Sequence, residues 1–249
     1  MFSPLEQFLV LNLFSFYGDL IDFSVTNNSV MILIAMAIFY LMSKSLYTFG
    51  KFVISNKWQL LFEEIYVTCV ELVYDILGLK GEMFFPVIFS TFLIILVLNI
   101  LGLIPYSFTV TSHLASTLIF SYMIFIGVVA VGIYYHGFNL VTLFLPAGTS
   151  LALSFLLIPV EILSYFFKPV SLGVRLFANL MAGHTLLKVI IGFSWALLGA
   201  GGILFIFYLL PLAAIVILFV LETAVSVIQS YVFTILITIY LNDVISLSH

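Results

Sequence analysis

Charge is what this sequence has least of. Asp, Glu, Lys and Arg make up 7% of its 249 residues, whereas hydrophobic residues make up 64%. Soluble domains contain about 25% charged residues, so this composition excludes a water-soluble protein and predicts an integral membrane protein in a lipid bilayer. The few basic residues form no patch that could meet phosphates, which excludes nucleic acid as a partner.

Cysteine is almost absent as well, and a glycine-rich nucleotide-binding motif is missing. Cys69 is the only cysteine, so the chain can form neither an internal disulfide nor a cysteine cluster for a metal. No GxxxxGK[ST] motif occurs, so the chain is not expected to bind ATP catalytically. We therefore expect no cofactor, no metal site and no enzyme activity of the chain on its own.

Apolar segments of about 20 residues, the length that spans a bilayer, predict an all-α membrane protein. We expect five to six helices in a single domain, residues 1–249. The first half is predicted to contain a transmembrane helix, an amphipathic surface helix and a transmembrane pair, over residues 25–46, 58–79 and 84–135. Glu64, Glu71 and Asp75 recur at helical spacing among apolar residues, which indicates the amphipathic helix. The segment 136–150 is predicted to be a re-entrant or surface connection.

Two very long apolar stretches, about 151–191 and 203–241, make up the second half of the chain. A helix of 40 residues is about 60 Å long, twice the thickness of the hydrocarbon layer. Each stretch could be two short spans folded at a break, for which Pro169 is a candidate in the first. Alternatively, each is one kinked helix that lies far toward the membrane plane. Periodicity alone does not choose between these.

Four lysines flank the amphipathic helix, in the connection between the first two predicted spans: Lys44, Lys51, Lys57 and Lys80. The positive-inside rule places that connection on the cytoplasm-like side, which is the matrix in a mitochondrion. The N-terminus is then outside. The C-terminus is inside if the chain crosses five times.

Arg175 is the only arginine, and it lies within the first long apolar stretch. A guanidinium in a membrane span costs from about 2.5 to more than 10 kcal/mol, and arginine cannot lose its proton to avoid that cost. The default interpretation is function, namely movement of an ion or proton past this charge. The alternative is a structural ion pair with a hidden carboxylate.

The other polar residues of the two long stretches fall into levels if the stretches pack as an antiparallel hairpin. His184 is nine residues from Arg175 toward the turn, and Glu222 is seven residues from Gln229 toward the turn. Pairing Arg175 with Gln229 therefore defines three levels: His184 with Glu222; Arg175 with Gln229 and with Asn179, which is one turn along the same face; and Glu161 with Asp243.

This layering is typical of a divided proton path. His and carboxylate side chains change protonation, so they can pass protons, whereas a fixed cation between them repels an arriving proton. Two half-paths of this kind fit a mobile carboxylate that takes up a proton from one and delivers it to the other. Simpler interpretations stay open: Glu161 and Asp243 could face headgroups, His184 could be a satisfied buried histidine, and Asn179 could bond a neighbouring helix.

The stretch PVSLGVRLFANLMAGH, which contains Arg175, resembles the signature of the a subunit of F-type rotary ATP synthases. The resemblance covers essentially the full length and also includes, in order, SPLEQF, LGLIPYSF, LFLPAGT, PVEILSYFFKPVSLG and LETAVSVIQSYVFTIL. Histidine at 184 and glutamate at 222 are similar to the mitochondrial version. Many bacterial relatives have the two residue types exchanged, which suggests that the two positions act as a pair.

The resemblance implies two long tilted helices, 151–241, that form a hairpin against a ring of c subunits, with peripheral-stalk subunits as further partners. It implies that Arg175 faces the ring carboxylate. The outer half-channel would be lined by Glu222, His184, Asn179 and Gln229, and the matrix-side half-channel by Glu161 and Asp243. The expected location is the mitochondrial inner membrane, with the N-terminus toward the intermembrane space and the C-terminus toward the matrix; a bacterial plasma membrane is the alternative.

Two other classes of protein make different predictions. A self-contained proton-coupled transporter or channel requires a carboxylate partner for Arg175 within this chain and commonly contains an internal repeat of spans. A purely structural subunit leaves the layered His184 and Glu222 unexplained. The resemblance implies instead the function of a stator subunit, which loads and unloads the carboxylates of a rotating ring with protons.

Overall fold

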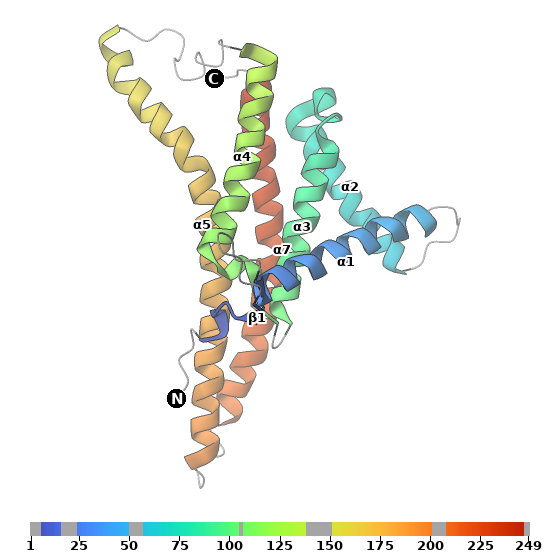
Figure 1. Ribbon diagram of the computed structural model, residues 1–249, viewed down its shortest axis with the longest axis vertical. Coiled ribbons are helices and arrows are strands. Elements are labelled where there is room, and N and C mark those ends of the chain that lie inside the picture. Colours follow the sequence, from blue (N-terminus) through green and yellow to red (C-terminus); the bar gives the residue numbers. More distant parts are fainter. Residues whose placement is uncertain are drawn as a thin grey trace. The chain divides into compact units, whose positions relative to one another are not determined.

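The computed structural model of the protein describes residues 6–15, 24–49, 57–104, 107–137, 151–200 and 208–246. These residues form six α-helices, so the predicted all-α membrane class is confirmed (Figure 1). The helices are α1 (Asn27–Phe49), α2 (Lys57–Leu77), α3 (Phe85–Leu103), α4 (Leu114–His136), α5 (Leu151–Ala200) and α7 (Leu209–Ser246). The predicted connection 136–150 lies almost wholly outside the described residues.

Four of these helices are long and apolar enough to cross a membrane: α3, α4, α5 and α7. The apolar part of α1 that the structure describes, Asn27–Met42, is shorter than a span requires. A crossing by residues 25–46 therefore remains a prediction. The pair predicted over 84–135 is present as α3 and α4, joined by a short 3-10 turn at Val110–Ser112.

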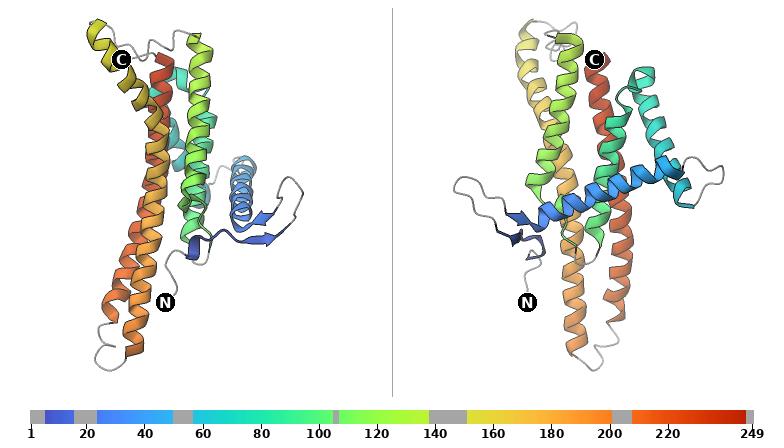
Figure 2. Two further views of the ribbon diagram at one scale, coloured as in Figure 1. Left: turned by 60° about the vertical axis from the view of Figure 1, so that its left-hand side comes forward. Right: turned by 45° about the vertical axis from the view of Figure 1, so that its right-hand side comes forward.

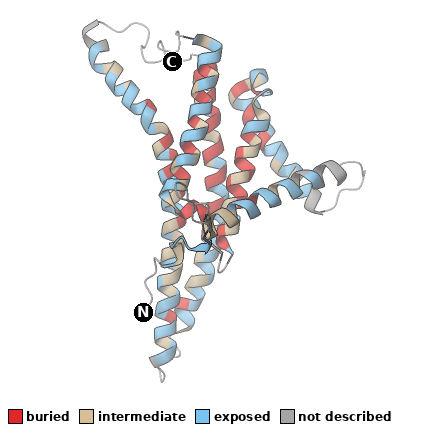
Figure 3. Cartoon of the chain, viewed as in Figure 1, coloured by how far each residue is buried: buried red, intermediate tan, exposed pale blue. Residues whose placement is uncertain are grey.

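The first long stretch is one uninterrupted helix, α5, so a break at Pro169 is excluded. Pro159 and Pro169 both lie inside it. Proline removes one backbone N–H from the helix, which membrane helices tolerate where neighbouring groups or water satisfy the freed carbonyl. The 50 residues of α5 extend about 75 Å, so the helix fits a bilayer of about 30 Å only if it tilts or protrudes. Much of α5 and α7 is exposed in the isolated chain (Figure 3).

The helix predicted over 58–79 is present as α2, and it is amphipathic. Cys69, Leu72, Val73 and Leu77 are buried at the spacing of one helix face, while the acidic residues of the helix are exposed. The helix ends at Gly78, whose φ of 60° lies in the left-handed region that a residue with a Cβ adopts only at a cost. The buried face packs on Ile88 of α3 and on Leu241 and Val244 of α7 in one hydrophobic cluster.

The described chain divides into two compact units, each assembled from three separate segments. Unit 1 consists of residues 1–39, 94–114 and 176–230, and unit 2 of residues 40–93, 115–175 and 231–249. The helices α1, α3, α5 and α7 each contribute residues to both units, so no single cut in the sequence separates them. A single membrane domain remains the prediction for the whole chain.

Unit 1 begins with a structure that the sequence did not indicate, a pair of short antiparallel strands. These are β1 (Asn12–Phe14) and β2 (Val25–Thr26), and Figure 2 shows them immediately before α1. Thr26 and Ser29 then form a reciprocal capping box, in which the backbone N–H of each donates to the side-chain oxygen of the other, at 3.0 and 3.4 Å. Local hydrogen bonding thus fixes where α1 starts.

Candidate functional site

His184 of α5 and Glu222 of α7 lie together in unit 1. His184 Nδ1 is 3.6 Å from Glu222 Oε1, and the two side chains are 15% and 6% exposed. The pair is an ion pair only when the histidine is protonated. Gly183 makes this approach possible, because a Cβ at that position would lie only 2.7 Å from Glu222 Oε1. The sequence argument placed these two residues at one level, and the structure brings them together.

A second polar contact joins the same two helices. Asn179 Nδ2 donates a hydrogen bond to Gln229 Oε1 at 2.9 Å. The spacing argument had paired Gln229 with Arg175, and the residue that bonds to Gln229 is instead the asparagine one turn further along α5. Asn179 is a better partner for Gln229 than Arg175 is, because the amides of Asn and Gln can each donate and accept hydrogen bonds.

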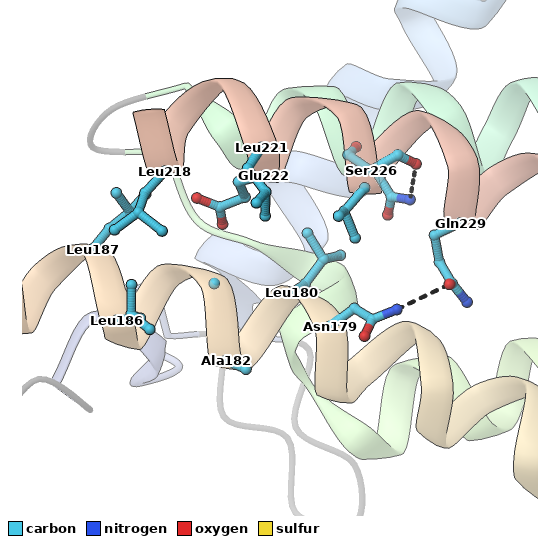
Figure 4. A pocket seen from close by; sticks show the side chains of 13 residues that line it. Asn179, Leu180, Ala182, Leu186, Leu187, Leu218, Leu221, Glu222, Ser226 and Gln229 are labelled. Carbon is cyan, nitrogen blue, oxygen red and sulfur yellow. Dashed lines mark hydrogen bonds between the residues drawn. The ribbon is translucent and has the colours of Figure 1, made fainter. Parts of the chain in front are cut away.

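These two contacts lie beside a cavity of about 250 Å³ within unit 1 (Figure 4). Asn179, Gly183, Glu222 and Gln229 contribute to its wall, together with leucines of α5 and α7. Several buried polar atoms of this region have no hydrogen-bond partner in the described protein: Asn99 Oδ1, His184 Nε2, both carboxylate oxygens of Glu222, Ser226 Oγ and Gln229 Nε2. Buried polar groups are almost always hydrogen-bonded, so this cavity is suited to hold several water molecules.

The sequence argument missed two residues of this cavity, Asn99 of α3 and Ser226 of α7. Asn99 is fully buried and its Nδ2 donates to the backbone oxygen of Ser226 at 3.3 Å. A lone asparagine within an apolar span was the available signal, since polar side chains in membrane helices usually face the protein interior. Its partner could not be inferred, because sequence spacing gives no register between α3 and α7.

Unit 2 contains a separate polar cluster around Asp243. Lys168 Nζ lies 3.3 Å from Asp243 Oδ2, and the lysine also lies over the rings of Tyr165 and Tyr240, at 5.1 and 4.8 Å from their centroids. The spacing argument placed Glu161 beside Asp243. Asp243 is paired with a cation instead, which is electrostatically preferred to the approach of a second carboxylate.

Glu161 is half-buried on α5 and forms no ion pair with any residue that the structure describes. Arg175 is exposed and likewise has no ion-pair partner in the described ranges. The structural alternative for Arg175, a hidden carboxylate of this chain, is thus not found there. The described residues also contain no group of three or more His, Cys, Asp or Glu side chains that could hold a metal ion.

The four apolar spans define a polytopic helical membrane protein, in which a buried His–carboxylate pair lies beside a cavity. A model of the family described as the ATP synthase A chain matches residues 29–242. The chain belongs to this family, the a subunits of the proton-translocating membrane sector of ATP synthase, which do not themselves catalyse ATP synthesis.

Individual relatives agree with the family match over nearly the whole chain. The ATP synthase subunit a of Pylaiella littoralis is 50% identical over 98% of this chain and 98% of its own length. That of Chondrus crispus is 49% identical over 98% and 96%, and that of Marchantia polymorpha is 43% identical over 98% and 98%. The resemblance seen in the sequence is therefore confirmed.

Proposed function

We propose that this chain is the stator of the ATP synthase membrane sector and contains two offset half-channels for protons, separated by Arg175. In the outer half-channel, Glu222 and His184 receive protons through the cavity, with Asn179 and Gln229 in its wall. In the matrix-side half-channel, Asp243 and Glu161 accept protons on their way out. The rotating partner is a ring of c subunits, whose carboxylates carry protons between the two.

The observation that carries this proposal is Glu222. Its carboxylate is buried on an apolar helix, within 3.6 Å of His184, and both of its oxygens lack a hydrogen-bond partner in the described protein. A buried carboxylate in this state is costly unless it exchanges protons or binds water. The adjacent cavity supplies the space for that water.

Arg175 has a different role in the proposal. It has no carboxylate partner among the described residues, so its exposed guanidinium is available to a carboxylate from another subunit. A positive charge favours the ionised form of a carboxylate that faces it, and so promotes release of the proton carried there. Along α5 it stands between Lys168, the partner of Asp243, and Asn179, the partner of Gln229.

The location we propose is the mitochondrial inner membrane, with the N-terminus toward the intermembrane space and the C-terminus toward the matrix. The lysines around α2 support the orientation through the positive-inside rule. Each charge that crosses gains about 2.3 kcal/mol per 100 mV of membrane potential, and this energy drives the rotation.

The test is proton pumping by the whole ATP synthase in membrane vesicles, driven by ATP and compared between variants of Glu222. Glu222→Gln keeps the shape of the side chain but cannot take up a proton, so we expect pumping to fall by about 100-fold. Glu82→Gln is the matched control, since Glu82 is exposed and lies outside the four spans. The exchange His184→Glu/Glu222→His should recover part of the activity that either single change removes. Normal pumping by Glu222→Gln would refute the proposal.

A further inference from the structure

Asn99 is the one polar residue of α3 whose side chain reaches another helix in the described structure. The helix also contains Ser90 and Thr91, but their hydroxyls donate to the carbonyls of Val87 and Ile88 in their own helix. Asn99 is 0% exposed. An amide in this place must be satisfied by the protein or by water.

Only half of the Asn99 amide is satisfied by the protein. Its Nδ2 donates to the carbonyl of Ser226, which can accept a second hydrogen bond besides the one within its own helix. Its Oδ1 has no hydrogen-bond partner among the described residues, and neither has Ser226 Oγ. Figure 4 shows Ser226 one turn along α7 from Glu222, in the wall of the same cavity.

The remaining partnerless groups around the cavity complement one another. Asn99 Oδ1 and the ionised carboxylate of Glu222 can only accept hydrogen bonds, whereas Gln229 Nε2 can only donate them. A water molecule can donate to two acceptors and accept from a donor at the same time. Water molecules in the cavity can therefore satisfy all three groups, which make no direct hydrogen bond to one another.

We infer that Asn99 is a positioning residue of the outer half-channel: its Oδ1 anchors the cavity water through which protons reach Glu222. Asn99 Oδ1 holds one hydrogen of a cavity water, and the other hydrogen is left to donate to the next water toward the carboxylate. When this water chain carries an extra proton, that proton passes to a Glu222 oxygen and neutral water remains. The amide itself exchanges no proton. This inference rests on the proposed function, and it adds α3 as a third wall of the half-channel.

The test measures passive proton flux through the membrane sector in vesicles with an imposed potential, normalised to the amount of assembled complex. Asn99→Leu keeps the branched shape of the side chain but removes both hydrogen-bonding groups, and the flux should fall about fivefold to tenfold. Asn99→Ser leaves room for a water and restores a hydroxyl, so most of the flux should return. Thr91→Val is the control on the same helix and should leave the flux unchanged.

The outcomes separate this inference from the function on which it rests. Glu222→Gln, measured in the same vesicles, tests the half-channel itself. If Glu222→Gln abolishes the flux and Asn99→Leu does not change it, the role of Asn99 is refuted while the half-channel stands. If Asn99→Leu and Asn99→Ser lower the flux equally, Asn99 acts through packing alone and the inference is also overturned. Normal flux in Glu222→Gln would overturn both.

Discussion

Gly183→Ala tests whether the position of the Glu222 carboxylate controls proton flow. A Cβ at residue 183 would lie 2.7 Å from Glu222 Oε1 and 3.0 Å from Cδ, whereas ordinary van der Waals contact begins at 3.4 Å. The carboxylate must therefore retreat by about 0.7 Å. The clash is with the end of a flexible side chain and not with backbone, so the two helices need not separate.

The cost of this change is expected in function and not in assembly. Displacing the side chain from its rotamer costs about 0.5–1.5 kcal/mol, while replacing glycine by alanine within a helix stabilises it by about 0.5–1 kcal/mol. These contributions nearly cancel, so the amount of assembled complex should stay close to normal. If the carboxylate must keep its present approach to His184, a loss of about 1 kcal/mol in the transfer step lowers the proton flux about fivefold.

The assay is passive proton flux in vesicles, with Gly192→Ala as the matched control. Gly192 lies on the same helix, and a Cβ there would meet nothing within 4 Å. Gly192→Ala should therefore leave the flux unchanged. Equal flux in Gly183→Ala and Gly192→Ala would refute the reasoning, because it would mean that the carboxylate can move without effect.

Three further predictions concern unit 2. Gly173→Ala should lower the amount of assembled protein that remains after mild heating. The Cβ of the new alanine would lie 3.0 Å from the Thr117 backbone oxygen, and such overpacking costs about 1–3 kcal/mol. An unchanged amount would contradict the α4–α5 contact. Burial raises the pKa of the Cys69 thiol to about 11, so the reactive thiolate is scarce at pH 8. A maleimide should therefore label Cys69 only after the protein is unfolded in detergent, and the rate of labelling should rise as the pH increases. Fast labelling of the native protein at pH 8 would contradict this prediction. Lys168→Met should lower thermal stability by less than about 1 kcal/mol, because the pair with Asp243 is partly exposed; a larger loss would show that the pair is more strongly shielded.

The parts of the fold that the sequence predicts are those with a strong local pattern. Glu64, Glu71 and Asp75 indicated the amphipathic helix because their spacing alone identifies one face. The sequence spacing also predicted that His184 lies near Glu222. Each residue of either helix advances by the same 1.5 Å, so similar numbers of residues counted along two antiparallel helices reach a similar level.

Other features depend on contacts that spacing does not encode. Whether α5 breaks at Pro169 depends on how the freed backbone groups are satisfied, and the apolar pattern is the same on both sides of the proline. The register between α3 and α7 places Asn99 beside Ser226, and it is set by packing. The choice of Lys168 as the partner of Asp243 follows from charge, whereas the hairpin count had favoured Glu161.

The central claim is that Arg175 separates two half-paths, and proton pumping in vesicles that contain the assembled complex with Arg175→Ala tests it most directly. The account predicts that ATP-driven pumping is lost and that a passive proton leak appears, because nothing then prevents protons from passing between the half-paths. Normal coupled pumping without a leak would contradict the claim, and the arginine would then have only a structural role.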